Sequence, residues 1–191
     1  MVSVDGYFEG QNHELDWHNV DEEFTKYSLE LLDSVDTLVF GRTTYELMAG
    51  YWPTAKGLED DPEIAERMNS IQKLVLSKTL ERVDWKNSKL IKTNISNEIS
   101  CQKLRQCKDI AIFGSSDLAL GLIPENLIDE YRFIINPILL GHGKTILNGL
   151  DFRLKLKLLY ARSFSSGNVL LCYSAQNNEI TRSSFINEMI N

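Results

Sequence analysis

The chain has 191 residues, of which 43% are hydrophobic and 25% are charged, a composition typical of a soluble globular protein. Its 20 lysines and arginines stand against 27 aspartates and glutamates, so the net charge is −7. This acidic balance argues against a nucleic-acid partner, because binding to a phosphate backbone depends on many basic side chains.

Short apolar runs and the amphipathic stretches between them predict the elements in chain order. The first strand, residues 1–4, is cut short by the turn pair Asp5-Gly6; either it is short here or part of it is missing from the sequence. Consecutive apolar residues predict strands buried on both faces at residues 37–40, 73–76, 110–113 and 132–135. Helices are predicted at residues 21–32, 43–49 and 116–122, and another begins at Asp61-Pro62.

The last third of the sequence predicts a hairpin, because two apolar runs, residues 154–159 and 169–173, flank the turn residues 165–168. With the alternating strands and helices before it, this predicts an α/β fold. We expect a single domain with a mixed, mostly parallel sheet, helices on both faces and an antiparallel C-terminal hairpin. Residues 1–175 are assigned to this domain and residues 176–191 to a C-terminal tail or docked helix.

Neither the cysteines nor the histidines have the spacing of a metal site. The cysteines are Cys101, Cys107 and Cys172, and the histidines are His13, His18 and His142. An odd number of cysteines without a Cys-x-x-Cys pair favours a reducing compartment over a disulfide framework. No apolar run approaches the ~18 residues of a membrane span, and the start of the chain lacks a signal-peptide pattern. We therefore expect a cytoplasmic protein with no metal and no membrane partner.

Three of the predicted strands end with small or hydroxyl residues beside basic or helix-starting ones. Gly41-Arg42 follows strand 37–40, Ser77-Lys78 follows strand 73–76, and Gly114-Ser115-Ser116 follows strand 110–113. Ligands of open α/β sheets bind beyond the carboxyl ends of the strands, where free amides and basic side chains attract phosphate groups. Each junction alone is explained as well by a helix cap. Their succession favours a site for a pyrophosphate and one further phosphate.

Six segments, in this order, resemble the dihydrofolate reductase-like superfamily: residues 3–8 (SVDGYF), 16–17 (DW), 41–46 (GRTTYE), 76–77 (LS), 113–116 (FGSS) and 136–143 (NPILLGHG). Within it, the sequence is most similar to stand-alone relatives of the C-terminal reductase domain of the bifunctional riboflavin biosynthesis protein. The resemblance covers nearly the whole chain, to about Tyr173. The zinc signature of the deaminase half, His-x-Glu with Pro-Cys-x-x-Cys, is absent, so the resemblance is to the reductase half alone.

The resemblance implies NADPH as the cofactor, lying across the strand ends and giving a hydride from its nicotinamide. The family's turn after the third of these strands is usually richer in glycine, so Ser115 and Ser116 either crowd a phosphate or bind it. Arg42 and Lys78 agree with this on physical grounds, because an acidic protein needs local positive charge to hold such an anion. The implied cofactor-binding residues are Gly41, Arg42 and Thr44 at the phosphates, Ser77 and Lys78 near the 2′-phosphate, and Gly114, Ser115, Ser116 and Leu118 under the pyrophosphate and nicotinamide.

Reduction of a C=N or C=O bond also needs a proton at the heteroatom, and a carboxylic acid is a common donor. The riboflavin-type reductases imply Asp5 as this catalytic residue, although Asp5-Gly6 is also explained as a turn alone. Trp17, beside Asp16, is predicted either to stack on a planar substrate or to lie in the core. Asp16 and Glu22 are the other carboxyl candidates for the donor. Glu22 is also a substrate-side candidate, although a carboxylate there also favours a helix N-terminus.

The leading hypothesis is an NADPH-dependent reductase of a small pyrimidine- or pteridine-like substrate, similar to the 5-amino-6-(5-phosphoribosylamino)uracil reductase of riboflavin biosynthesis. Relatives of this domain are commonly dimers, so a homodimer is expected. Dihydrofolate reductases keep their acid on the first helix, where this sequence has Thr25 or a neighbouring residue in register, and this puts folate reduction in second place. Two further alternatives are a nucleotide-binding module without turnover and a structural α/β domain without a cofactor.

Overall fold

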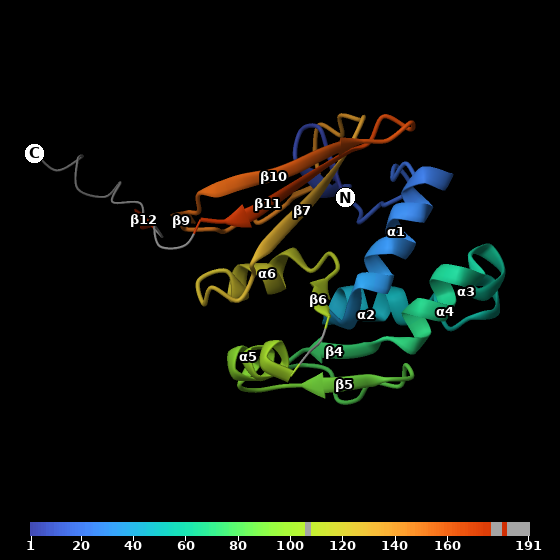
Figure 1. Cartoon of the computed structure of the whole chain (residues 1–191), viewed down its shortest axis with the longest axis vertical. Coiled ribbons are helices and arrows are strands. Elements are labelled where there is room, and N and C mark those ends of the chain that lie inside the picture. The colour runs from blue at the N-terminus through green and yellow to red at the C-terminus, as the bar shows by residue number, and fades with distance from the viewer. Residues whose placement is uncertain (106–107, 177–180, 183–191) are drawn as a thin grey trace, which may run out of the picture. The chain divides into compact units, whose positions relative to one another are not determined.

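A computed structural model describes residues 1–105, 108–176 and 181–182 (Figure 1). The chain divides into two compact units, a terminal unit made of Met1–Asn19 and Ile128–Asn191 and a central unit, Val20–Leu127. Each unit holds one four-stranded sheet, and helices lie between the strands of the central unit along the chain. The mixed α/β class predicted from the sequence is confirmed.

The sheet of the central unit is parallel throughout, in the order β5-β4-β3-β6. Parallel neighbours need crossover connections, and helices supply most of these here. The strands are β3 (Val35–Gly41), β4 (Gln72–Leu76), β5 (Ser88–Ile91) and β6 (Asp109–Ile112). The helices are α1 (Glu22–Ser34), α2 (Arg42–Ala49), α3 (Ala55–Asp60), α4 (Pro62–Ser70), α5 (Ile95–Arg105) and α6 (Ser116–Leu122).

Local sequence explains where these helices begin. The Asp21 carboxylate accepts a 2.8 Å hydrogen bond from an amide in the first turn of α1. Asp61 caps α4 in the same way, and Pro62 occupies the first helical turn, where a missing N–H costs nothing. The N-cap of α2 is Gly41, which has no side chain to cap the helix. The first amides of α2 therefore remain available to another partner.

Apolar residues of β3 and β4 form the centre of the central unit's core. The fully buried ones, with no exposed surface, are Leu38, Val39, Phe40, Leu74 and Val75. Because successive residues of a strand point to opposite faces, burial of consecutive residues means that both faces of these strands are covered. This confirms the sequence prediction for residues 37–40 and, with one exception, for residues 73–76.

The exception is Lys73, a basic residue whose side chain is fully buried in strand β4. Its ammonium donates to the carbonyl oxygens of Ile71 at 2.7 Å, Lys86 at 3.1 Å and Asn69 at 3.3 Å. It also lies 4.5 Å from the centre of the Trp85 ring. Burial lowers the pKa of this group to about 8, so it is still mostly protonated at pH 7. Three carbonyls and one indole thus replace the water that the charge has lost.

The sheet of the terminal unit has the order β1-β7-β11-β10. Strand β1 pairs with β7 in parallel, and the other two pairings are antiparallel. Its strands are β1 (Val2–Ser3), β7 (Glu130–Asn136), β10 (Leu156–Ser163) and β11 (Val169–Ala175). Two short pairs accompany it, β2 (Tyr7–Glu9) with β8 (Lys144–Thr145) and β9 (Phe152–Arg153) with β12 (Thr181–Arg182).

The predicted hairpin is confirmed as β10 and β11, with a bulge between Leu158 and Tyr160. The first strand, β1, has two residues. Of the predicted tail, residues 177–180 and 183–191 lie outside the described residues, and 181–182 form β12. The boundary between a domain at 1–175 and a tail stays a prediction. None of the described helices is long and apolar enough to cross a membrane.

Replacing Lys73 with Met is expected to lower the free energy of unfolding by about 1–3 kcal/mol, because three buried carbonyl groups lose their donor. Urea unfolding at pH 7 measures the difference. The matched control is Lys89→Met on β5, where the ammonium is half-exposed and pairs with Glu98 at 2.6 Å. That change is expected to cost less than about 1 kcal/mol. Equal stability of Lys73→Met and the control would contradict the role given to the buried ammonium.

Candidate functional site

The three junctions predicted to bind an anion lie along one edge of the central sheet. Strands β4, β3 and β6 are neighbours and parallel, with Gly41 opposite Leu76 and Val39 opposite Ile112. The carboxyl ends of parallel strands meet at the same edge, so the segments after these strands share it. The β3–α2 junction occupies the middle position.

At the β3–α2 junction, the backbone comes close to the turn that follows β6. A Cβ atom added to Gly41 would lie 3.2 Å from the Ser115 hydroxyl oxygen and 3.9 Å from the Cβ of Leu118. Arg42, the next residue, has a side chain that is 51% exposed and pairs with Glu46 one turn along α2, at 3.1 Å. An anion at this junction would therefore compete with the Glu46 carboxylate for the guanidinium group.

At the β6–α6 junction, two successive residues have left-handed backbone conformations. Gly114 has φ +59° and Ser115 has φ +54°. The Ser115 hydroxyl accepts a 2.9 Å hydrogen bond from the Gly41 amide and lies 2.8 Å from the Thr44 hydroxyl. Hydrogen bonds thus connect residues 71 and 74 positions apart. The structure brings Gly41, Thr44 and Ser115 together, as the sequence predicted for one site.

At the β4 junction, Ser77 is buried and Lys78 is exposed. The Ser77 hydroxyl accepts from the amides of Thr79 at 3.2 Å and Leu80 at 3.1 Å, which closes the turn after β4. Ser77 therefore has a turn-forming role that is independent of a ligand. The ammonium of Lys78 extends from this turn on an exposed side chain. Ser116, the first residue of α6, is 8% exposed.

Asp5 belongs to the terminal unit, and its carboxylate is an acceptor of three hydrogen bonds. The Ser3 hydroxyl donates at 2.6 Å, and the amides of Leu140 and Gly141 donate at 3.1 and 2.7 Å. These bonds, that of Ser3 first, lower the pKa of Asp5 to about 2. Asp5 is therefore ionised at neutral pH, which favours a role as anchor of the 137–143 loop over proton donation. The proton-donor role stays a prediction.

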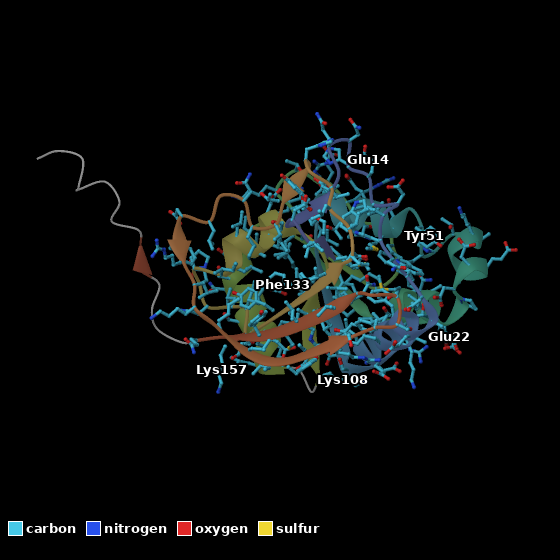
Figure 2. The ribbon with its side chains drawn as sticks, turned by 90° about the horizontal axis from the view of Figure 1, so that it is seen from above. Glu14, Glu22, Tyr51, Lys108, Phe133 and Lys157 are labelled. Carbon is cyan, nitrogen blue, oxygen red and sulfur yellow. The ribbon has the colours of Figure 1, made fainter. Side chains whose placement is uncertain are left out.

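Trp17 and Glu22 lie in different units. The Trp17 indole donates a 3.0 Å hydrogen bond to the carbonyl of Glu14, and its half-buried ring meets His18 edge-on at 4.5 Å. Burial lowers the pKa of His18 to about 4, so this imidazole is neutral at pH 7. Glu22 is exposed in the first turn of α1 (Figure 2). That position is explained by the helix dipole, and a substrate contact stays a prediction for both residues.

A cluster of asparagines that the sequence analysis missed fixes the end of the N-terminal segment. The Asn136 side chain accepts from the Asn19 amide at 2.8 Å, and the Asn168 side chain donates to the Asn19 carbonyl at 2.6 Å. Asn136 and Asn168 are both fully buried. The carbonyl oxygen of the Asn168 side chain has no partner among the described residues. No sequence spacing signals this contact, because the three residues are far apart in the chain.

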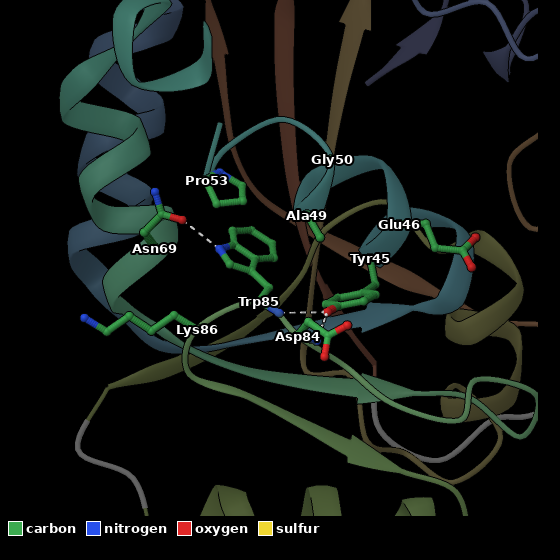
Figure 3. Close-up of a pocket in the computed structure, with 9 residues that line it drawn as sticks. All are labelled: Tyr45, Glu46, Ala49, Gly50, Pro53, Asn69, Asp84, Trp85 and Lys86. Atoms are coloured by element: carbon green, nitrogen blue, oxygen red, sulfur yellow. Dashed lines mark hydrogen bonds between the residues drawn. The ribbon is translucent and has the colours of Figure 1, made fainter. Parts of the chain in front are cut away.

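The central unit also has a cavity of about 630 Å³ (Figure 3). The Tyr45 hydroxyl accepts from the amides of Asp84 at 3.0 Å and Trp85 at 3.1 Å, and the Trp85 indole donates to Asn69 at 2.7 Å. None of the predicted cofactor-binding residues lines this cavity. The lining residues are Tyr45, Glu46, Ala49, Gly50, Pro53, Asn69, Asp84, Trp85 and Lys86.

The described residues hold no group of three metal-ligating side chains.

Asp5→Asn is expected to reduce the pH dependence of stability at acid pH. The carboxyl pKa is lower in the folded state, so its stabilising contribution is present above the unfolded value of 3.8 and is lost as pH falls towards 2. Urea midpoints at pH 7 and pH 3 measure this, with exposed Asp16→Asn as the control. We expect the gap between wild type and Asp5→Asn to narrow at pH 3. A gap that is the same at both pH values would contradict the anchoring role.

Comparison with known proteins identifies the fold and the family. The family model of the RibD C-terminal domain matches residues 1–170. The uncharacterized protein YyaP of Bacillus subtilis is 33% identical over 174 residues, which are 90% of each chain. A putative riboflavin biosynthesis protein from Shewanella sp. PV-4 is 25% identical, with a TM-score of 0.69 over 92% of this chain and 95% of that one.

A more distant structure shares the fold. Dihydrofolate reductase from Enterococcus faecalis, complexed with NADP(H) and RAB-propyl, is 16% identical, with a TM-score of 0.57 over 92% of this chain and 93% of that one. The fold is therefore dihydrofolate reductase-like, as the sequence predicted. The match to the family model and the identity with YyaP place the chain in the RibD C-terminal domain family.

Proposed function

We propose that the chain is an NADPH-dependent reductase of a small pyrimidine- or pteridine-like heterocycle, of the 5-amino-6-(5-phosphoribosylamino)uracil reductase type. The family and the structural relatives support a riboflavin-type, reductase-like function. The observation that carries the proposal is the hydrogen bonding of Ser115 to Gly41 and Thr44. It unites two of the three predicted phosphate-binding junctions at the carboxyl edge of a parallel sheet, where α/β proteins bind nucleotides.

The residues at this edge fit the phosphates of a dinucleotide. The first amides of α2 have no side-chain cap, and the dipole of the helix favours an anion there. Arg42 and Lys78 offer positive charge on exposed side chains of an acidic chain. Gly41 keeps the backbone free of a side chain beside the Ser115 hydroxyl, and Gly114 does so beside the Thr44 side chain. NADPH, when bound, supplies the hydride, and the role of these residues is to hold and orient it.

We propose solvent water, ahead of Asp5, as the source of the proton in the reaction. Asp5 was the favoured carboxyl group, and its three hydrogen bonds and its pKa of about 2 favour the ionised form at neutral pH. A carboxylic acid that is already ionised has no proton to donate. The same observation keeps a second candidate function open, a module that binds the dinucleotide without turnover. Folate reduction is disfavoured because Thr25 stands on α1, the first helix, where dihydrofolate reductases carry their acid.

Binding of NADPH and NADH to the wild-type protein and to single variants tests the proposal. NADPH at a hundred times its Kd is expected to stabilise the fold by about 2.7 kcal/mol. Lys78→Ala is expected to weaken NADPH about 3- to 10-fold and to leave NADH nearly unchanged, because only NADPH has the 2′-phosphate. Arg42→Ala is expected to weaken both alike, through the shared pyrophosphate. Lys56→Ala, on exposed α3, is the matched control.

Oxidation of bound NADPH, measured as a decrease in its absorbance, separates a reductase from a binding module. We expect this absorbance to decrease with the ribosylaminopyrimidine and to change little or not at all with dihydrofolate. Binding without oxidation of NADPH by either substrate would favour the non-catalytic module. Failure of every dinucleotide to bind the wild-type protein would overturn the proposal and leave the structural α/β domain.

We further propose a homodimer, which the exposed edge strand β10 supports. Strand β10 is last in the order of its sheet, and Leu158, Leu159 and Tyr160 are 50%, 47% and 44% exposed on it. An exposed apolar edge strand is suited to pair with a second copy across a two-fold axis. Sedimentation velocity is expected to give twice the mass of 21.8 kDa, and Leu159→Lys to shift the protein towards monomer. A wild-type monomer at micromolar concentration would contradict the dimer.

A further inference from the structure

Ser115 is exceptional among the residues of the candidate site because it has a left-handed backbone without being a glycine. Its φ is +54° and its ψ is +53°. The left-handed conformation is strained for a residue with a Cβ, and glycine avoids this strain. Gly114, directly before it, adopts φ +59° as a glycine. The chain therefore keeps a side chain where glycine would be less strained, and the contacts of that side chain show what it does.

The Ser115 hydroxyl connects the start of α6 to both sides of the start of α2. It accepts a 2.9 Å hydrogen bond from the amide of Gly41, the N-cap residue of α2. It also shares a hydrogen bond of 2.8 Å with the hydroxyl of Thr44, in the first turn of the same helix. All three residues belong to the central unit. The hydroxyl thus holds the two glycine-containing junctions at a fixed separation.

The hydroxyl pair of Thr44 and Ser115 has one proton that can be donated to a ligand. Thr44 and Ser115 carry two hydroxyl protons, and one of them lies in the bond between the two oxygens. Whichever residue donates in that bond, the proton of the other is left. No hydrogen bond to another described residue uses it, and both side chains are only half-buried. An oxygen of an anionic ligand is an acceptor suited to this remaining proton.

We propose that Ser115 is a positioning residue: its hydroxyl joins the β3–α2 and β6–α6 junctions into one preformed binding site for a dinucleotide's phosphates. This rests on the proposed function. Because the two junctions are already held together, binding does not have to order them, and affinity rises by the ordering cost that is avoided. The two hydrogen bonds of the Ser115 hydroxyl offset the strain of its left-handed backbone. The strained residue is kept because its side chain is needed for the binding site.

Ser115→Gly is the main test. Glycine relieves the strain while the bridge is lost, so the two effects on stability oppose each other. We expect the thermal midpoint to stay within about 4 °C of wild type. The Kd for NADP⁺, measured by calorimetry, is expected to rise about tenfold. Ser70→Gly, at the end of α4, is the matched control, because its hydroxyl bonds a backbone carbonyl of the same helix and is exposed.

Thr44→Val removes the other hydroxyl and keeps the side-chain shape. If both residues act through one bridge, the Ser115→Gly, Thr44→Val double variant binds NADP⁺ no more weakly than the weaker single variant. Amide hydrogen exchange at Gly41 reads the bridge directly: it is expected to accelerate in Ser115→Gly, and NADP⁺ is expected to slow it again. A purely structural role would change amide exchange and the thermal midpoint. It would not give weaker NADP⁺ binding in the single variants with no further loss in the double variant.

The outcomes separate this inference from the proposed function. If wild type binds NADP⁺ and Ser115→Gly binds it equally well, the positioning role is overturned and the proposed function survives. Independent, additive losses in the double variant overturn the bridge and make Thr44 and Ser115 separate contacts. If wild type binds no dinucleotide, the proposed function fails, and the phosphate site fails with it. Should Ser115→Gly not fold, Thr44→Val alone decides, since an unchanged Kd there also overturns the bridge.

Discussion

The parallel pairing of β3 with β4 on one side and β6 on the other is the constraint on which the candidate site depends. It brings the ends of three strands that are distant in sequence to one edge. The Ser115 hydroxyl then joins two of those ends through Gly41 and Thr44. Without the pairing, the three junctions would be separate helix starts, each explained by capping alone.

Some charged side chains stabilise the fold, and others are exposed at the candidate site. The chain has a net charge of −7, and the fully buried Lys73 ammonium binds three carbonyl groups and the Trp85 ring of its own unit. Arg42 and Lys78, by contrast, are exposed beside the strand ends. Asp5 is likewise a structural charge, held by the Ser3 hydroxyl and two amides. The basic groups suited to a ligand are therefore those that the fold does not bury.

Sequence patterns predicted elements that have consecutive apolar residues or a clear helix-start signal. Strand β3 was predicted because its residues 37–40 include three consecutive apolar ones, and the start of α4 was predicted from Asp61 and Pro62. Helix α5 was missed, because Ile95–Arg105 has few apolar residues and Leu104 among them is 88% exposed. Strand β5 was missed because its four residues are partly polar.

The sequence predicted which residues lie at the site better than it predicted what each of them does. The position of Gly41 and Ser115 after parallel strands was visible in the sequence, and their mutual hydrogen bond was not. That bond depends on a left-handed backbone at Ser115, which glycine usually provides and serine does not signal. Asp5 is the proton donor that the resemblance to the riboflavin-type reductases implies. Its carboxylate accepts hydrogen bonds from the Ser3 hydroxyl and from the amides of Leu140 and Gly141, which are 135 and 136 residues away.

Backbone amide chemical-shift mapping during a titration with NADP⁺ tests most directly whether the carboxyl edge of the central sheet holds a dinucleotide. The account predicts that the largest changes fall on residues 41–44 and 114–116, with a smaller group at 77–78. Changes confined to the residues around the cavity beside Trp85, or no changes at saturating NADP⁺, would contradict it.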